Sequence, residues 1–188
     1  KGIPPSVIHY SAAIESANKV KETSTSWELW RLMKVNEVEP NNHAYSSIIN
    51  AAAIDKDVRT VLRLLEEMER KGIAIDVVTY TTAICACGPD WLLALEVLDD
   101  MAMDGVPPNL QSYTAAMCCC LAGEEYREVI AVFERMKGAG IAPDLRAYNL
   151  ALMACDRNED VHGRGLLETE MAKAGIERTF ALDWDRRW

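Results

Sequence analysis

Apolar side chains recur along this chain at the three- and four-residue steps that are typical of amphipathic helices. In residues 42–76 one run of this kind comprises Tyr45, Ile48, Ile49 and Ala52. A second run follows it and comprises Val61, Leu62, Leu64, Leu65 and Met68. The pattern predicts two consecutive helices in this stretch, and it contains none of the strict alternation that would indicate a β-strand.

The same pattern returns at a fixed interval. Tyrosines are separated by 35, 35, 33 and 35 residues, at Tyr10, Tyr45, Tyr80, Tyr113 and Tyr148. Methionines stand in phase with them, at Met33, Met68, Met101, Met136 and Met171. A period of this length is typical of helical repeat proteins, so we expect both sets of side chains to be buried between successive helices.

The third interval lacks two residues, and these are missing between Tyr80 and Met101. The segment Cys87-Gly88-Pro89-Asp90 lies in that interval. Glycine and proline are common in turns, and proline is tolerated in the first turn of a helix. We therefore predict that the deletion shortens a turn and leaves both flanking helices whole.

Glycines mark the expected ends of the second helix in four units, where a left-handed residue can close the last turn. They are Gly72, Gly105, Gly140 and Gly175, and prolines follow soon after the second helix at Pro40, Pro108 and Pro143. A unit of about 35 residues cannot bury both helices alone, so neighbouring units must stack into one continuous core. The predicted fold class is all-α, an α-solenoid of about five stacked helix-turn-helix repeats with ten major helices.

Small residues recur at one position of the first helix in each unit and indicate close helix packing there. They are Ala17, Ala52, Cys87, Cys120 and Cys155. None of the six cysteines has the Cys-x-x-Cys spacing of zinc or redox motifs, so we interpret them as reduced structural thiols of a reducing compartment. A metal site at Cys118, Cys119 and Cys120 is the alternative.

Charge limits the functions that the chain can have. The formal net charge is −9 and the sequence pI is about 4.9, whereas a nucleic-acid-binding protein usually carries a basic face. Residues 77–109 contain no Lys or Arg, and their Asp99, Asp100 and Asp104 are expected to face solvent.

No apolar run approaches the roughly 20 residues that cross a bilayer, so we expect no membrane-spanning helix. The chain begins at Lys1 without a methionine, so we expect a segment of a longer protein.

Two segments carry a family likeness. The runs Asp76-Val77-Val78-Thr79-Tyr80-Thr81-Thr82 and Gly140-Ile141-Ala142-Pro143-Asp144 resemble the start and the end of pentatricopeptide repeats. Tetratricopeptide repeats, with a 34-residue period and a different Trp, Leu-Gly and Tyr pattern, fit less well. The units then span residues 7–41, 42–76, 77–109, 110–144 and 145–179. Residues 1–6 resemble the end of a preceding unit, and residues 180–188 form an aromatic tail that caps the last helices or docks a partner.

The resemblance implies that each unit reads one base of single-stranded RNA through its fifth and last residues. In order, these pairs are Ser11 with Asn41, Ser46 with Asp76, Thr81 with Asn109, Thr114 with Asp144, and Asn149 with Thr179. A hydroxyl with Asn implies adenine, a hydroxyl with Asp implies guanine, and Asn149 implies a pyrimidine. The implied order from 5′ to 3′ is adenine, guanine, adenine, guanine and pyrimidine.

The same residue types have a second interpretation. Ser or Thr early in a helix and Asp or Asn just before one are ordinary capping residues, so these pairs could exist without RNA. At the second position, where the family packs aliphatic side chains against bases, Ile8 and Val78 fit. His43, Gln111 and Arg146 depart from that preference. Lys19 and Arg157, near the ends of the first helices, are the candidate phosphate contacts.

Catalytic signals are absent from the sequence. No histidine is followed two residues later by glutamate, as it is in zinc deaminases. No glycine-rich phosphate loop or Ser-His-Asp arrangement stands out either. We therefore predict a protein that is not an enzyme and needs no metal, cofactor or small-molecule substrate. The leading hypothesis, from the resemblance, is a single-stranded RNA-binding protein for RNA processing, stability or translation in a mitochondrion or chloroplast. The alternatives are a non-catalytic scaffold subunit of a large organellar complex, such as a ribosome or membrane assembly, and an enzyme whose catalytic domain lies beyond this segment.

Overall fold

Helices account for nearly all of the secondary structure in the computed structural model, which describes residues 5–176. In chain order they are α1 (Val7–Lys19), α2 (Thr23–Val35), α3 (Asn42–Ile54), α4 (Val58–Arg70), α5 (Val77–Ala86), α6 (Trp91–Met103), α7 (Leu110–Ala122), α8 (Tyr126–Gly138), α9 (Leu145–Arg157) and α10 (Val161–Lys173). No β-strand occurs in residues 5–176. The prediction of ten helices and an all-α repeat fold is therefore confirmed.

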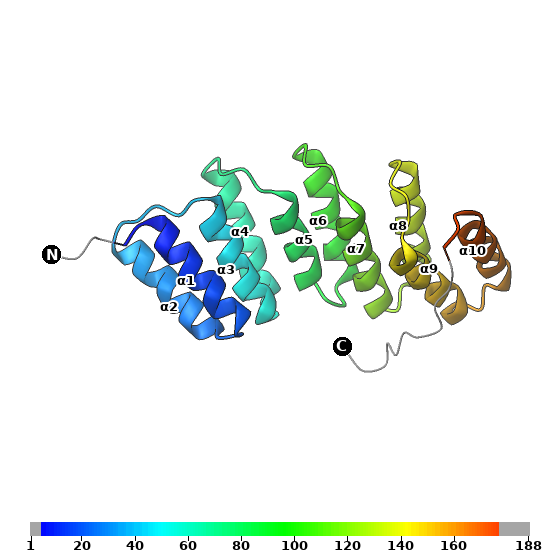
Figure 1. The fold of residues 1–188 in the computed structure, drawn as a ribbon, viewed down its shortest axis with the longest axis horizontal. Helices are drawn as coiled ribbons and strands as arrows, with labels where there is room; N and C mark the ends of the chain where they lie inside the picture. The colour runs from blue at the N-terminus through cyan, green and yellow to red at the C-terminus, as the bar shows by residue number, and fades with distance from the viewer. Residues whose placement is uncertain (1–4, 177–188) are drawn as a thin grey trace.

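The helices form an elongated array in which each contacts only its neighbours (Figure 1). The first helices α1, α3, α5 and α7 each contact the next first helix along the chain, which ends at α9. Each second helix packs against the first helix before it, and α2, α4, α6 and α8 also pack against the first helix that follows. Stability of such an array is close to a sum of units and nearest-neighbour interfaces.

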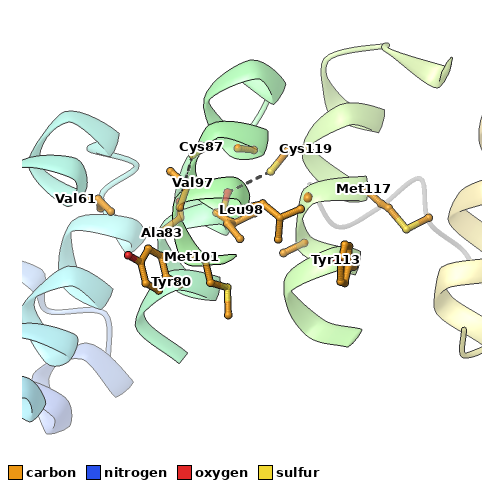
Figure 2. Close-up of a cluster of buried hydrophobic side chains, with 14 of the residues drawn as sticks. Val61, Tyr80, Ala83, Cys87, Val97, Leu98, Met101, Tyr113, Met117 and Cys119 are labelled. Atoms are coloured by element: carbon orange, nitrogen blue, oxygen red, sulfur yellow. Dashed lines mark hydrogen bonds between the residues drawn. The ribbon is translucent and has the colours of Figure 1, made fainter. Parts of the chain in front are cut away.

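The tyrosine and methionine series form the repeating part of the core. All ten of these side chains are buried, with no more than 6% of any residue's surface exposed. Figure 2 shows the third and fourth units, where Tyr80 and Met101 lie close together and Tyr113 and Met117 lie on the neighbouring α7. The Cys119 thiol donates to the Ile84 carbonyl at 3.2 Å and joins the two units. The prediction that both series are buried is confirmed.

Within residues 5–176, four of the five tyrosine hydroxyls in this series, all but that of Tyr113, have polar partners on the second helix or just after it, so these rings are buried while their polar ends remain paired. Tyr45 donates to Glu67 at 2.8 Å and Tyr148 donates to Glu170 at 3.2 Å, at equivalent places in two units. Burial alone would raise the pKa of Glu67, but hydrogen bonds from Tyr45 and Lys71 hold it below its ordinary value. The Glu67 carboxylate is therefore part of the packing of the second unit.

The glycines that were expected to end the second helices do so in the left-handed conformation. Gly72, Gly105, Gly140 and Gly175 have φ between 67° and 77°. In the first unit Glu37 takes the equivalent place after α2, with φ 56°. A residue with a Cβ is strained there, so Glu37→Gly is compatible with the fold, whereas the reverse change at Gly72 adds strain.

The prediction for the short third unit was wrong. Helix α5 has 10 residues where the other first helices have 13, and the turn after it, residues 87–90, is longer than the three-residue turn after α3. The deletion thus shortens the helix and not the turn. The cause is Gly88-Pro89: proline lacks the N–H that a helix interior needs, and Gly88 adopts φ 56°. Helix α5 therefore ends at Ala86.

The shortened helix brings the turn of the third unit close against the fourth. A Cβ built on Gly123, the residue after α7, would lie 2.8 Å from the Pro89 carbonyl oxygen and 2.8 Å from Cδ1 of Trp91. No side chain fits at that distance without a shift of backbone. Gly123 is thus required by the close approach of two units.

We expect Gly123→Ala to lower the free energy of unfolding by about 1–3 kcal/mol, the usual cost of overpacking. The matched control is Gly138→Ala at the end of α8, where an added Cβ meets no atom within 4 Å. That change should be neutral or slightly stabilising, because alanine favours a helix more than glycine does. Urea denaturation of both variants checks this, and equal effects of the two changes would contradict the packing argument.

Candidate nucleic-acid interface

The implied base-reading residues lie at the starts of the first helices, one set for each unit. Asn41, Asp76, Asn109 and Asp144 are the N-cap residues of α3, α5, α7 and α9. Their Oδ1 atoms accept the N–H of the residue three places on, at 3.0, 2.8, 3.0 and 2.8 Å respectively. The capping interpretation is therefore correct for all four.

Capping uses only one of the two polar atoms on each side chain. Because Oδ1 of Asn41 and Asn109 accepts a backbone N–H, the remaining Nδ2 of each amide is a donor. In Asp76 and Asp144 the remaining Oδ2 is an acceptor. Within residues 5–176 these four atoms have no hydrogen-bond partner, and the four units therefore offer donor, acceptor, donor and acceptor in turn.

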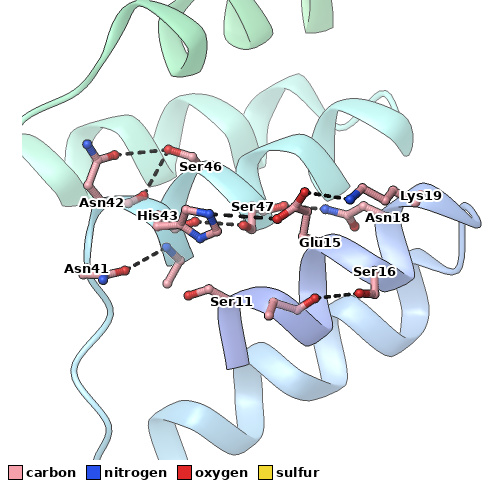
Figure 3. A network of polar contacts seen from close by, with 12 residues as sticks. Ser11, Glu15, Ser16, Asn18, Lys19, Asn41, Asn42, His43, Ser46 and Ser47 are labelled. Atoms are coloured by element: carbon pink, nitrogen blue, oxygen red, sulfur yellow. Dashed lines mark hydrogen bonds and ion pairs between the residues drawn. The ribbon is translucent and has the colours of Figure 1, made fainter. Parts of the chain in front are cut away.

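The fifth residues lie one turn further along each first helix, and their hydroxyls bond their own helix. Ser11, Ser46, Thr81 and Thr114 donate to the carbonyl four residues earlier, at 2.8, 3.0, 2.7 and 2.8 Å. A hydroxyl has one proton, so each oxygen can only accept from a base. Figure 3 shows the bonds of Ser46 to Asn42, and it shows Asn41 at the start of the same helix, α3. Ser11 and Thr114 are buried, whereas Ser46, Thr81 and Asn149 are partly exposed.

The second residues face solvent. Ile8 and Val78 are exposed by 73% and 70%, which is unusual for large aliphatic side chains and suits packing against a flat ring. His43, Gln111 and Arg146 are exposed as well. His43 lies 3.9 Å from the Glu15 carboxylate, and Arg146 Nη2 lies 3.5 Å from Sγ of Cys118. These two side chains therefore have local partners on the preceding unit.

The two candidate phosphate contacts lie far from the reading residues. Lys19 and Arg157 are the last residues of α1 and α9, roughly 18 Å along the helix from its first residue. Lys19 Nζ is 2.9 Å from Glu15 and remains 72% exposed. Arg157 is exposed and has no ion-pair partner in the part of the chain that the structure describes. The reading residues and the cations thus mark opposite ends of the first-helix layer. Thr179 and residues 180–188 lie outside the described residues.

Several basic residues that sequence alone could not place are bound in ion pairs between units. Lys34 contacts Glu67 at 3.5 Å and joins α2 to α4, and Lys137 contacts Glu170 at 2.9 Å and joins α8 to α10. Arg135 lies 2.5 Å from Asp99 of the acidic third unit. As expected, Asp99, Asp100 and Asp104 are exposed. These pairs stabilise unit stacking and reduce the cations that are free for phosphate.

The cysteines behave as structural thiols. Burial raises the pKa of Cys87 and of Cys120 to about 12, so both are protonated at neutral pH. Cys119 and Cys120 are buried and Cys118 is half-buried. No group of three or more His, Cys, Asp or Glu side chains in residues 5–176 is arranged to hold a metal ion. None of the helices in that range is long and apolar enough to span a membrane.

Sequence reasoning missed two hydroxyls that contact the fifth residues from the next unit. Thr79 Oγ1 lies 2.6 Å from Ser46 Oγ, and Ser112 Oγ lies 3.0 Å from Thr81 Oγ1. Thr79 and Ser112 are the third residues of their own units. The available signal was a hydroxyl residue at that place in two units, but the contact depends on how neighbouring helices align.

Comparison with known proteins decides the family. A family model described as Pentatricopeptide repeat domain matches residues 1–53, 63–121 and 96–158, and one described as PPR repeat matches residues 43–73. The chain belongs to the pentatricopeptide repeat family. The matches of the first model together cover well over half of the chain, and they include Asn41, Asp76, Asn109 and Asp144.

One sequence relative of this pentatricopeptide repeat chain is the mitochondrial 15S rRNA processing factor CCM1 of Yarrowia lipolytica. The two are 32% identical over 88 residues, which is 46% of this chain and 11% of the relative. The chain thus spans about a tenth of the length of that protein.

Solved structures of similar fold include the pentatricopeptide repeat protein PPR10 in complex with an 18-nt psaJ RNA element. The TM-score is 0.72 at 19% identity, over 94% of this chain and 30% of that one. The nuclear protein-only RNase P 2 of Arabidopsis thaliana matches with a TM-score of 0.76 at 16% identity, over 88% of this chain and 38% of that one. At these identities the likeness establishes the fold.

Proposed function

We propose that this pentatricopeptide repeat chain binds single-stranded RNA and acts in RNA processing, stability or translation inside a mitochondrion or chloroplast. The observation that carries the proposal is the regular series of polar atoms left over after capping. Asn41, Asp76, Asn109 and Asp144 offer donor, acceptor, donor and acceptor at equal places in successive units. A structural cap needs only Oδ1, so capping alone gives no reason for this alternation.

The alternation fits the Watson–Crick edges of purines. Guanine presents the N1–H and N2–H donors, which suit the free Oδ2 of Asp76 and Asp144. Adenine presents the N1 acceptor, which suits the free Nδ2 of Asn41 and Asn109. The proposed order from 5′ to 3′ is therefore AGAG followed by a pyrimidine. Exposed Ile8 and Val78 are proposed to pack against bases.

The names of relatives and similar structures support both the compartment and the RNA-binding role in this proposal. The Yarrowia lipolytica relative is named as a mitochondrial rRNA processing factor, which favours a mitochondrion over a chloroplast for the proposal. PPR10 and the PPR domain of Arabidopsis thaliana protein-only RNase P 1 were solved with an RNA element and with tRNA. We propose a binding role for this chain and no catalytic step.

A second candidate function is a scaffold within an organellar protein complex. The net charge of −9 and the absence of Lys and Arg from residues 77–109 favour it, because both weaken attraction to phosphate. The acidic third unit around Asp99, Asp100 and Asp104 would be the surface for a basic partner, with Asp99 already paired with Arg135 of α8. Purifying the native protein from its organelle separates the two: bound RNA of purine-rich sequence supports the first, and stable co-migration with other subunits without RNA supports the second.

The charge distribution also predicts a weak salt dependence. With only Lys19 and Arg157 as phosphate contacts, the slope of log K against log salt should be roughly −1.4, at about −0.7 for each phosphate neutralised. Replacing both residues with Gln should bring the slope close to zero. A titration of RNA binding between low and physiological salt measures it, and a slope several times steeper would show that other cations contact the RNA.

A further inference from the structure

The reading hydroxyls of the second and third units each have a hydroxyl neighbour on the following unit. Ser46 Oγ and Thr79 Oγ1 are 2.6 Å apart, and Thr81 Oγ1 and Ser112 Oγ are 3.0 Å apart. Thr79 and Ser112 are almost fully buried. Neither residue belongs to the set that the family resemblance implies.

The two reading hydroxyls use their own protons on their own helices. Ser46 donates to Asn42, whose carbonyl and Oδ1 lie at 3.0 and 3.1 Å, and Thr81 donates to the Val77 carbonyl at 2.7 Å. The remaining proton in each pair is that of the neighbour: Thr79 donates to Ser46, and Ser112 has one proton for Thr81 and Asn109 together. One lone pair then remains on Ser46 and on Thr81, and it can accept from a base donor.

The same neighbours also hold the second reading residue of the unit. The Thr79 N–H donates to Asp76 Oδ1 at 2.8 Å, and the Ser112 N–H donates to Asn109 Oδ1 at 3.0 Å. Ser112 Oγ lies a further 3.1 Å from that Oδ1, so its single proton is shared between Asn109 and Thr81. Each third residue thus joins both reading groups of the preceding unit.

The first and fourth units lack this arrangement and provide an internal comparison. Ala44 and Ala147 are the third residues of the units that follow those of Ser11 and Thr114, and alanine offers no hydroxyl. Ser11 and Thr114 are only 3% and 5% exposed. The hydroxyl-bearing third residue therefore follows the two units whose reading hydroxyl is partly exposed.

We propose that Thr79 and Ser112 are positioning residues that set base discrimination by the second and third units. These two units, which face the second and third nucleotides of the proposed order, form the most selective part of the RNA site. The inference rests on the proposed function, because it assumes that Ser46, Asp76, Thr81 and Asn109 contact bases.

The test compares Thr79→Val with the unchanged chain on two single strands that differ at the second nucleotide, AGAGU and AAAGU. Valine keeps the shape of threonine and the backbone N–H that Asp76 caps, and removes only the hydroxyl. We expect the preference for guanine to fall by about 3- to 10-fold, as for the loss of one net hydrogen bond. Thr79→Ser should restore it. The matched control Thr82→Val removes a hydroxyl that bonds only Val78 of its own helix, and should leave the preference unchanged.

A second variant adds the feature where it is missing. Ala147→Ser places a hydroxyl beside Thr114 and should raise the preference of the fourth unit for guanine by about 2- to 5-fold, with helix content unchanged by circular dichroism. An unchanged ratio in folded Thr79→Val, on RNA that the unchanged chain discriminates, overturns this inference and leaves the proposed function standing. Failure of the unchanged chain to discriminate bases at all overturns both.

Discussion

Tyr45→Ala is expected to lower the free energy of unfolding by about 3–5 kcal/mol, the range for removal of a large buried aromatic side chain. Tyr45 is fully buried, and its ring meets Trp30 edge-on with centroids 5.1 Å apart. The change also leaves Glu67 without its 2.8 Å hydrogen bond. Thermal or urea denaturation followed by circular dichroism measures the loss.

Two further variants separate the ring from the hydroxyl. Tyr45→Phe should cost only about 0.5–1.5 kcal/mol, and Tyr113→Phe should cost less, because the Tyr113 hydroxyl has no protein partner within residues 5–176. The pKa of Glu67 is lowered in the fold, so its stabilising contact with Tyr45 is present at neutral pH and is lost as pH falls through that lowered pKa. The difference in free energy of unfolding between the unchanged chain and Tyr45→Phe should therefore become smaller as the pH is lowered. A loss of stability for Tyr113→Phe as large as that for Tyr45→Phe would contradict this account.

Asp76→Asn is expected to change the base that the second unit prefers from guanine to adenine. Asparagine caps a helix as well as aspartate does, as Asn41 and Asn109 show in this chain, so the fold should be kept. Oδ1 would still accept the Thr79 N–H, while the free atom changes from an acceptor to a donor. By comparison with good base contacts elsewhere, the switch in preference should amount to about 1–3 kcal/mol.

The control for this change is Asp57→Asn, another helix cap. Asp57 accepts from the Thr60 N–H at 3.1 Å and begins α4, a second helix, where no base contact is proposed. Binding of AGAGU and AAAGU by each variant gives the two ratios. The interpretation of Asp76 as a reading residue would be wrong if both variants behaved alike, or if Asp76→Asn lowered affinity for the two strands equally.

Most of the fold could be predicted because it depends on short-range periodicity. The spacing of Tyr45 to Met68 defines two helices without reference to the rest of the chain, and the 35-residue period defines how many times they recur. The end of α5 could not be predicted from the same pattern. Gly88-Pro89 is compatible with a shortened turn or a shortened helix, and the packing of Pro89 against Gly123 became visible only in three dimensions.

The candidate site was predictable in part for the same reason. Asn41, Asp76 and their equivalents recur with the period, so their place at the helix starts follows from the sequence. The hydrogen bonds of Ser46 with Thr79 and of Thr81 with Ser112, and the ion pair of Lys34 with Glu67, join residues more than 30 positions apart. Such contacts depend on the alignment of neighbouring helices, which no local pattern determines.

The measurement that tests the central claim most directly is binding of the unchanged chain to two labelled single strands by fluorescence anisotropy at low salt. One carries the proposed order AGAGU, and the other carries its complement ACUCU. The account predicts tighter binding of AGAGU, with the preference retained as salt is raised because base contacts and not phosphates produce it. Equal affinity for the two strands, or no binding by a chain whose helices are intact, would contradict the claim that these units read RNA bases.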